Sequence, residues 1–373
     1  MIIRSLANTI NDKLWKNKAI IVMGARQVGK TSLLKMLFAD ANDVLWLNAD
    51  EPDVRALFEN ATSTILKQHF GNHKIIIIDE AQRINNVGVK LKLITDQMQD
   101  KQLIATGSSS FDLANKINEP LTGRKWEYKM FPLSFGEMVN HHGLINEKRL
   151  VPHRMIYGYY PNVVTNAGDE KDILLQLADS YLYRDVLAYE GIKKPDIISK
   201  LLQALAFQVG SEVSLRELGE ICQIDYKTVE KYIVLLEQSY VIFRLASFNR
   251  NLRNELKNKR KIYFYDNGIR NALINNFNPV ELRQDTDALW ENFIISERLK
   301  YINYSGQWKN RWFWRTVEKQ EIDYIEEDDG QIEAFEFKWN PKKQSNIPQI
   351  FKKTYNNNIF KIINRDNIEE FLI

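Results

Sequence analysis

The sequence predicts an α/β fold whose N-terminal part is a parallel sheet, and three apolar runs carry this prediction. The run Ile20–Met23 leads into a glycine-rich turn and then into an apolar helix start. The run Ile75–Ile78 is entirely β-branched, as is typical of a parallel strand that is buried on both faces. The run Leu103–Ala105 ends in a polar loop. Because ligands bind at the carboxyl ends of strands in such sheets, we expect the functional residues directly after these runs.

Composition describes an ordinary globular chain. Its 373 residues correspond to about two or three domains, and 44% hydrophobic residues are enough to build real cores. The 51 basic and 48 acidic residues give a net charge of +3, which is too balanced to indicate a nucleic-acid partner by itself. There is no apolar run of the roughly 18 residues that a membrane helix needs, no signal-peptide pattern, and no cysteine other than Cys222. We therefore expect a cytoplasmic protein with no membrane partner.

Residues 24–31 read G-x-x-x-x-G-K-T between a strand and a helix, which is the P-loop pattern in its required context. Gly24 and Gly29 let the backbone turn tightly, so that successive N–H groups and the positive end of the next helix face one phosphate. Lys30 can reach the β and γ phosphates, and Thr31 can give a hydroxyl to Mg²⁺. The pattern predicts ATP and Mg²⁺ as cofactors and a catalytic role for Lys30. The expected nucleotide contacts are Gly24, Ala25, Arg26, Gln27, Val28, Gly29, Lys30, Thr31 and Ser32.

Two carboxylates, Asp79 and Glu80, follow the isoleucine run and read as a Walker B motif. Asp79 would bind the nucleotide's Mg²⁺, and Glu80 would orient or deprotonate the attacking water. The alternative is a core strand that ends in an acidic turn.

Arg124 follows the glycine of a predicted loop. An arginine beside a γ-phosphate stabilises the charge of the transition state, so Arg124 is a candidate catalytic residue. It could act in cis or on a neighbouring subunit of a homo-oligomer. The alternative is a surface arginine.

The N-terminal motifs together resemble a large prokaryotic family of AAA-type P-loop ATPases, whose C-terminal region is a domain of unknown function. In AAA-type ATPases the strand beside Walker B ends in a polar residue that senses the γ-phosphate. The resemblance therefore implies Thr106 or Ser108 in that role, with a plain glycine- and serine-rich turn as the alternative. The resemblance to this family spans nearly the whole chain and leaves the biological role open. The segments that carry it are Gly24–Thr31, Ile75–Ala81, Thr106–Ser110, Leu121–Arg124 and Pro132–Glu137.

A winged helix is predicted in the middle of the chain. Ser214–Ile221 begins with a capping box, a short turn follows, and Tyr226–Leu236 is a second helix, so the pair reads as a helix-turn-helix. The strand Val241–Leu245 would start a wing. Glu230 and Glu237 dilute the charge of the second helix, so a structural lid is the alternative to DNA contact. The side chains that would read DNA are Tyr226, Lys227, Thr228 and Lys231.

The most basic run of the chain is Arg250–Lys261. A phosphate backbone is the natural partner of such a run, and a solvated loop is the alternative.

The sequence of the C-terminal part predicts a nuclease-like sheet. A helix over Leu289–Tyr301 precedes three strands, and strand alternation places Asp323, Glu336 and Lys338 on one face. With Glu291 from the helix, the carboxylates would bind Mg²⁺ and the lysine would activate water for phosphodiester cleavage. The D…ExK pattern resembles the PD-(D/E)xK nuclease fold, although Ile322 stands where that motif has proline. The alternative is the ordinary alternation of a half-exposed strand.

The predicted domains are an AAA-type ATPase over residues 1–150, a helical linker or lid over 151–200, a winged helix over 201–265 and a nuclease-like domain over 266–373. The main functional hypothesis is an ATPase whose hydrolysis moves the C-terminal module on nucleic acid. The alternatives are a nucleotide-gated protein-binding switch and a metal-dependent nuclease under ATP control.

Overall fold

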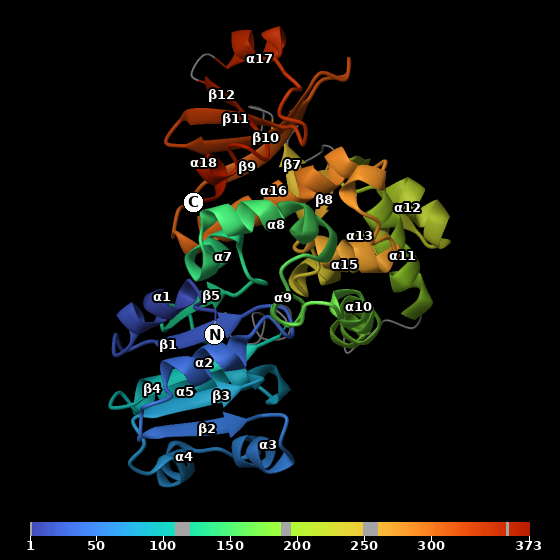
Figure 1. Ribbon diagram of the computed structural model, residues 1–373. Helices are drawn as coiled ribbons and strands as arrows, with labels where there is room; N and C mark the ends of the chain where they lie inside the picture. Colours follow the sequence, from blue (N-terminus) through green and yellow to red (C-terminus); the bar gives the residue numbers. More distant parts are fainter. Residues whose placement is uncertain (1, 109–119, 188–194, 249–259, 356–357) are drawn as a thin grey trace. The chain divides into compact units, whose positions relative to one another are not determined.

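The computed structural model describes residues 2–108, 120–187, 195–248, 260–355 and 358–373. The chain divides into two units (Figure 1). The first comprises residues 1–132 with 238–240, and the second comprises 133–237 with 241–373. The first unit therefore ends near Pro132, whereas the sequence suggested a boundary near residue 150.

The first unit is built on a five-stranded, wholly parallel sheet in the order β2-β3-β4-β1-β5. Every residue of β1, β3 and β4 is buried, as expected for interior parallel strands. The strands are β1 (Ala19–Met23), β2 (Val44–Asn48), β3 (Ile75–Asp79), β4 (Gln102–Gly107) and β5 (Lys125–Lys129). The helices are α1 (Leu6–Lys13), α2 (Lys30–Leu37), α3 (Pro52–Glu59), α4 (Ser63–Phe70), the 3₁₀ turn η1 (Ala81–Arg83) and α5 (Val87–Gln97).

Strand β4 lies between the P-loop strand β1 and the Walker B strand β3. Its Thr106 pairs with Val22 of β1, and its Ala105 pairs with Ile78 of β3. Because all three strands run in the same direction, their carboxyl ends meet at one edge. This edge collects Gly24, Asp79 and the loop after β4.

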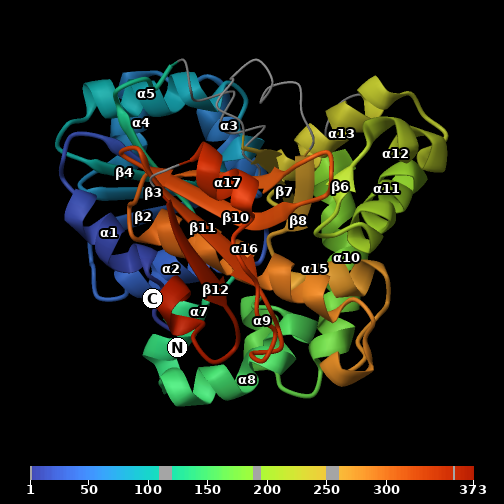
Figure 2. The same ribbon diagram turned by 90° about the horizontal axis from the view of Figure 1, so that it is seen from above.

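The second unit contains a seven-stranded mixed sheet in the order β12-β11-β10-β9-β7-β8-β6 (Figure 2). Its strands are β6 (Glu212–Val213), β7 (Ile242–Ser247), β8 (Arg260–Phe264), β9 (Asn310–Arg315), β10 (Glu321–Asp328), β11 (Gln331–Phe337) and β12 (Asn358–Ile363). Its helices are α7 (Phe135–His142), α8 (Leu144–Tyr157), α9 (Pro161–Thr165), α10 (Glu170–Leu187), α11 (Pro195–Phe207), α12 (Leu215–Cys222), α13 (Tyr226–Gln238), α15 (Asn267–Leu273), the 3₁₀ turn η2 (Val280–Leu282), α16 (Thr286–Tyr304), α17 (Gln349–Thr354) and α18 (Glu369–Leu372).

The seven-stranded sheet crosses the domain boundary that the sequence suggested near residue 265. Strands β6, β8 and β7 precede that boundary and pair antiparallel with one another. Strands β9, β10 and β11 follow it and also pair antiparallel. One short parallel contact joins the two groups, at Ala246 with Trp312 and Ser247 with Phe313.

Helix α16 is the central helix of the second unit, and its buried polar residues hold the start of that unit. Glu297 accepts the Phe135 N–H at 2.7 Å, and the Lys300 ammonium donates to the Leu133 carbonyl at 3.0 Å. The Lys300 ammonium also lies 2.5 Å from the Glu297 carboxylate. Burial raises the pKa of Glu297 to about 7, although the Lys300 charge opposes that rise.

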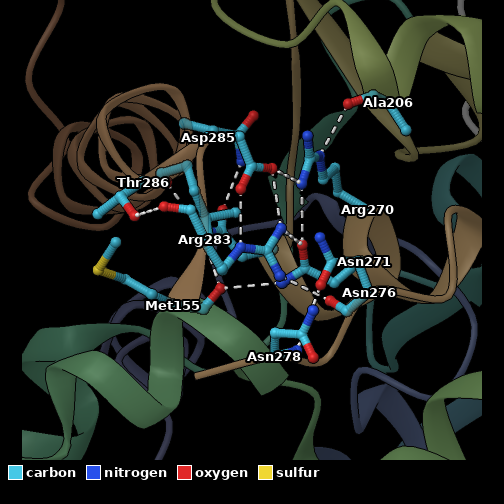
Figure 3. A network of polar contacts seen from close by, with 12 residues as sticks. Met155, Ala206, Arg270, Asn271, Asn276, Asn278, Arg283, Asp285 and Thr286 are labelled. Carbon is cyan, nitrogen blue, oxygen red and sulfur yellow. Dashed lines mark hydrogen bonds and ion pairs between the residues drawn. The ribbon is translucent and has the colours of Figure 1, made fainter. Parts of the chain in front are cut away.

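A second buried polar network precedes α16 (Figure 3). Asp285 binds two arginines, with Arg270 Nη1 at 2.6 Å and Arg283 Nε at 2.8 Å. Arg270 also donates to the Ala206 carbonyl at 2.8 Å, and Arg283 donates to Asn271 Oδ1 at 3.1 Å. Both guanidinium groups are almost fully buried. Asp285 is therefore the counter-charge for two desolvated cations.

The first prediction concerns Asp285→Asn, which removes that counter-charge. Its free energy of unfolding should fall by about 3 kcal/mol at neutral pH, because an unpaired buried charge is costly. Although burial raises the pKa of Asp285, the arginines outweigh burial and lower it below the ordinary value of 3.8. A lowered folded-state pKa means that the stabilisation is present above about pH 4 and is lost as the pH falls further.

Urea unfolding at neutral and at acidic pH measures this effect. The difference between wild type and Asp285→Asn should be large at neutral pH and should shrink near pH 3. The same difference at both pH values would contradict this role of Asp285.

Candidate nucleotide-binding site

The loop over residues 24–29 joins β1 to α2 and requires glycine at Gly24. A Cβ atom at this position would lie 2.0 Å from the carbonyl oxygen of Met130. The Met130 N–H donates to the Met23 carbonyl at 2.7 Å, which extends the β1–β5 pairing up to the loop. Gly29 caps α2 with φ +95°, in the left-handed region that favours glycine. Sequence and backbone therefore agree on a tight loop that ends at a helix N-terminus.

The Lys30 side chain is buried and folds back over this loop. Its ammonium donates to the carbonyls of Gly24 at 3.0 Å and Ala25 at 2.8 Å. A buried ammonium bound to loop carbonyls places a positive charge at the anion-binding end of α2. The loop and its lysine thus fit a phosphate group.

The Asp79 carboxylate is the meeting point of three elements at the sheet edge. Its Oδ2 accepts the hydroxyl of Thr31, from α2, at 2.8 Å. Its Oδ1 accepts the hydroxyl of Thr106, from β4. The Thr106 hydroxyl oxygen in turn accepts the Glu80 N–H at 3.0 Å. A carboxylate and a hydroxyl side by side are the oxygen ligands that Mg²⁺ takes beside nucleotide phosphates.

Glu80 has a left-handed backbone with φ +53°. Such a conformation costs a non-glycine residue on the order of 1–3 kcal/mol and concentrates at functional sites. Its carboxylate accepts a hydrogen bond from Gln82 Nε2, which also donates to the Ser108 hydroxyl at 2.9 Å. The structure therefore brings Glu80, Thr106 and Ser108 together beside Asp79. Ser109 and Ser110 lie outside the described residues.

Two residues at this site, Arg4 and Gln82, were not predicted from the sequence. The Arg4 guanidinium is buried and donates to the Val28 carbonyl at 2.5 Å and to the Phe131 carbonyl at 2.7 Å. It therefore fixes the P-loop backbone to the chain after β5. No sequence motif includes an arginine before the first helix. Gln82 follows the Walker B motif but is not part of it, so its contacts are known only from the structure.

Comparison with known proteins agrees with this geometry. Residues 16–139 match the model of a family described as an AAA domain. These residues are an AAA-type P-loop ATPase domain. Residues 148–280 and 286–367 match two domains of unknown function, DUF8612 and DUF4143.

Relatives and solved structures extend the similarity along the chain. An uncharacterized protein of Haemophilus influenzae is 27% identical over 282 residues, covering 68% of this chain and 68% of that protein. An uncharacterized protein of Mycobacterium tuberculosis is 25% identical over 341 residues, covering 90% of this chain and 73% of that protein. A Walker-type ATPase of Pyrococcus abyssi shares 14% identity with a TM-score of 0.52, over 74% of this chain and 96% of that one. At this identity the structural likeness concerns the fold.

Arg124 lies at the opposite edge of the AAA domain's sheet from the P-loop. Its carbonyl accepts the N–H of Ala19, the first residue of β1, whereas Gly24 follows the last residue of that strand. Its side chain is 44% exposed and binds Asp96 Oδ1 at 2.6 Å. The hypothesis of a catalytic Arg124 acting in cis is therefore corrected, because a parallel strand separates it from the loop. An action on a neighbouring subunit stays a prediction.

The acidic residues of the second unit do converge, but they are bound by protein groups. Burial, Glu291 and Glu336 together raise the pKa of Asp323 well above its ordinary value. Glu291 Oε1 accepts bonds from Lys261 Nζ at 2.9 Å and the Tyr263 hydroxyl at 2.6 Å.

The remaining two predicted residues of this group bind each other, since Lys338 Nζ lies 2.7 Å from Glu336 Oε2. The Phe337 N–H donates to Asp323 Oδ2 at 2.8 Å. Within the described ranges, no group of three His, Cys, Asp or Glu side chains is placed to hold a metal ion. The metal site at Glu291, Asp323 and Glu336 stays a prediction.

Most of the predicted basic run, residues 250–259, lies outside the described part of the chain. Lys261 is buried and is paired with Glu291 and Glu321, so it is not available to a phosphate backbone. Arg260 is paired with Glu230 of α13 at 3.0 Å. Among the described helices, none is long and apolar enough to cross a membrane.

The second prediction is that Arg4→Ala weakens ATP binding about tenfold, because two charge-assisted bonds to the loop and its flank are lost. Isothermal titration calorimetry measures the affinity. Arg149→Ala, which changes an exposed arginine of α8, serves as the control and should bind ATP like wild type. A folded Arg4→Ala protein with unchanged affinity would contradict the positioning role.

Proposed function

We propose that the chain binds ATP with Mg²⁺ in its AAA domain and hydrolyses it, and that hydrolysis moves residues 133–373. The single observation that carries this proposal is the Asp79 network. It joins the P-loop helix, the Walker B strand and the strand between them through two hydroxyl groups.

Each residue of the site has a role in this proposal. The N–H groups of the loop and the Lys30 ammonium bind the phosphates, and Thr31 and Asp79 hold Mg²⁺. When bound, Mg²⁺ neutralises phosphate charge as a Lewis acid. Glu80 orients the attacking water, and Gln82 fixes the Glu80 carboxylate. Thr106 holds the Asp79 carboxylate, Ser108 binds the Gln82 amide, and both would sense the γ-phosphate.

The third prediction separates binding from hydrolysis. Glu80→Gln should lower ATP turnover by about a hundredfold or more, because a general base is lost, while ATP affinity stays close to that of wild type. Lys30→Ala should lose binding and therefore turnover, since the phosphate charge has no partner. Turnover that survives in Glu80→Gln would contradict the assigned role.

Nucleic acid is the partner that we propose for the second unit. The order α11, β6, α12, α13, β7, β8, with β8 paired to both β6 and β7, supports a winged-helix interpretation. The carboxylates that weakened the DNA hypothesis have partners, because Glu230 binds Arg260 and Glu237 binds Arg244 at 2.5 Å. Lys227 lies exposed at the start of α13. An exposed positive side chain at that position supports the proposal.

A protein-binding switch is the second candidate, because α13 of an AAA protein can also serve as a lid. Asp225 caps α13 by accepting the N–H groups of Lys227 at 3.0 Å and Thr228 at 3.1 Å. The Thr228 hydroxyl also donates to Asp225 at 2.6 Å, so Thr228 has a structural partner. A DNA contact by the Thr228 hydroxyl would compete with this bond, which favours the second candidate.

The fourth prediction is that single-stranded, duplex or branched DNA stimulates ATP turnover several-fold and that salt weakens the effect. A Lys227→Glu, Lys231→Glu double variant should lose the stimulation and keep the basal rate. Lys352→Glu with Lys353→Glu, which alters exposed residues of α17, is the matched control. No stimulation by any DNA would overturn the nucleic-acid proposal and favour the protein-binding switch.

A further inference from the structure

A pocket of about 290 Å³ lies within the second unit where β7 and β9 separate. These strands pair only at Ala246 with Trp312 and at Ser247 with Phe313. The preceding residues of both strands line the pocket instead of pairing with each other. A sheet that opens in its interior leaves room for a ligand rather than for a neighbouring strand.

The pocket has aromatic and apolar walls. Phe243 of β7 and Tyr265 after β8 line it, with their ring centroids 4.9 Å apart. Ile295 and Leu299 of α16 add aliphatic surface. Such walls favour a ligand with a planar or apolar body.

Three cations line the same pocket, and two of them are neutralised. Arg244 binds Glu237 at 2.5 Å, and Lys309 binds Glu326 at 2.9 Å. Within the described ranges, Arg311 has no carboxylate within 4.0 Å. Among the described residues, one positive charge at the pocket therefore has no carboxylate in direct contact.

Two buried tyrosines lie within the electrostatic reach of Arg311. Burial raises the pKa of Tyr265 and of Tyr324, and a nearby carboxylate raises each further, Glu237 for Tyr265 and Glu326 for Tyr324. The charge of Arg311 lowers both pKa values without reversing that rise. Each hydroxyl therefore keeps its proton and can donate a hydrogen bond. The Tyr324 hydroxyl is buried and makes no hydrogen bond of normal geometry in the part of the chain that the structure describes, although the Glu326 carboxylate lies close to it. A buried donor without an acceptor is unfavourable, and an acceptor on a ligand would remove that cost.

We propose that this pocket binds an aromatic phosphate ester of nucleotide size. The aromatic body packs against Phe243 and Tyr265, while Arg311 and the Tyr324 hydroxyl bind the phosphate oxygens. Guanidinium groups favour phosphate because their planar fork matches two of its oxygens. The ligand is either a free nucleoside monophosphate or one nucleotide of a single strand. The site lies in the second unit, so it is independent of the P-loop and does not rest on ATP hydrolysis.

Calorimetric titration of the full chain tests the proposal with three probes: dTMP, an oligothymidylate and inorganic phosphate. The Lys30→Ala background removes the P-loop as a competing site. Binding of dTMP identifies the free nucleotide as ligand, and binding of the oligothymidylate alone identifies a strand. In either case, Arg311→Ala should weaken binding about tenfold or more, and Arg311→Lys should restore part of it.

Two further variants separate a binding role from a structural one. Tyr324→Phe removes only the hydroxyl and should weaken the same probe several-fold without lowering the thermal midpoint. Arg365→Ala, at a half-exposed arginine outside the pocket, should bind like wild type. The proposal is overturned by the absence of binding to every probe, by equal affinity for inorganic phosphate and dTMP, or by binding that Arg311→Ala and Tyr324→Phe leave unchanged.

Discussion

The Asp79 carboxylate is the constraint on which the candidate site depends. It is buried at the sheet edge and accepts one hydroxyl from α2 and one from β4. This arrangement requires β4 to lie between β1 and β3, because only then does Thr106 reach Asp79 while Thr31 approaches from the P-loop helix. The same Thr106 hydroxyl accepts the Glu80 N–H and so fixes the residue proposed to orient water. The geometry of the candidate site therefore depends directly on the order of these three strands.

In the second unit, buried charged side chains form ion pairs with one another. Asp285 balances two arginines, Lys300 is paired with Glu297, and Lys261 binds Glu291. Burial alone would lower the pKa of Lys261, but the surrounding carboxylates raise it above its usual range. Such pairs are costly to break and favour one arrangement of the chain. Glu291 and Glu336, which a sequence pattern assigns to a metal ion, therefore also have protein partners in this unit.

Local patterns were sufficient to predict the parallel strands and the loops that form the candidate nucleotide site. The P-loop, Walker B and the polar end of β4 each depend on a few adjacent residues, so the sequence reveals them directly. Arg124 is a case in which a local pattern was not sufficient. It follows a glycine loop in the chain, but a parallel strand that begins after it must run the length of the sheet before reaching the P-loop edge.

The residues that the sequence could not predict act over long separations in the chain. Strand alternation correctly placed Asp323 and Glu336 together, yet it could not show that Lys261 and Tyr263 from β8 bind Glu291. Arg4 contacts the carbonyl of Phe131, 127 residues away, and backbone carbonyls have no sequence signature. The separation of β7 from β9 likewise depends on strand register, which periodicity alone leaves open.

The dependence of ATP affinity on Mg²⁺ tests the central claim most directly. Calorimetric titration of wild-type protein with ATP would be made once with excess Mg²⁺ and once with a chelator. If Thr31 and Asp79 hold the metal beside the phosphates, affinity should fall at least about tenfold when Mg²⁺ is removed. The same affinity under both conditions would contradict the account, because the Asp79 network would then serve the fold alone.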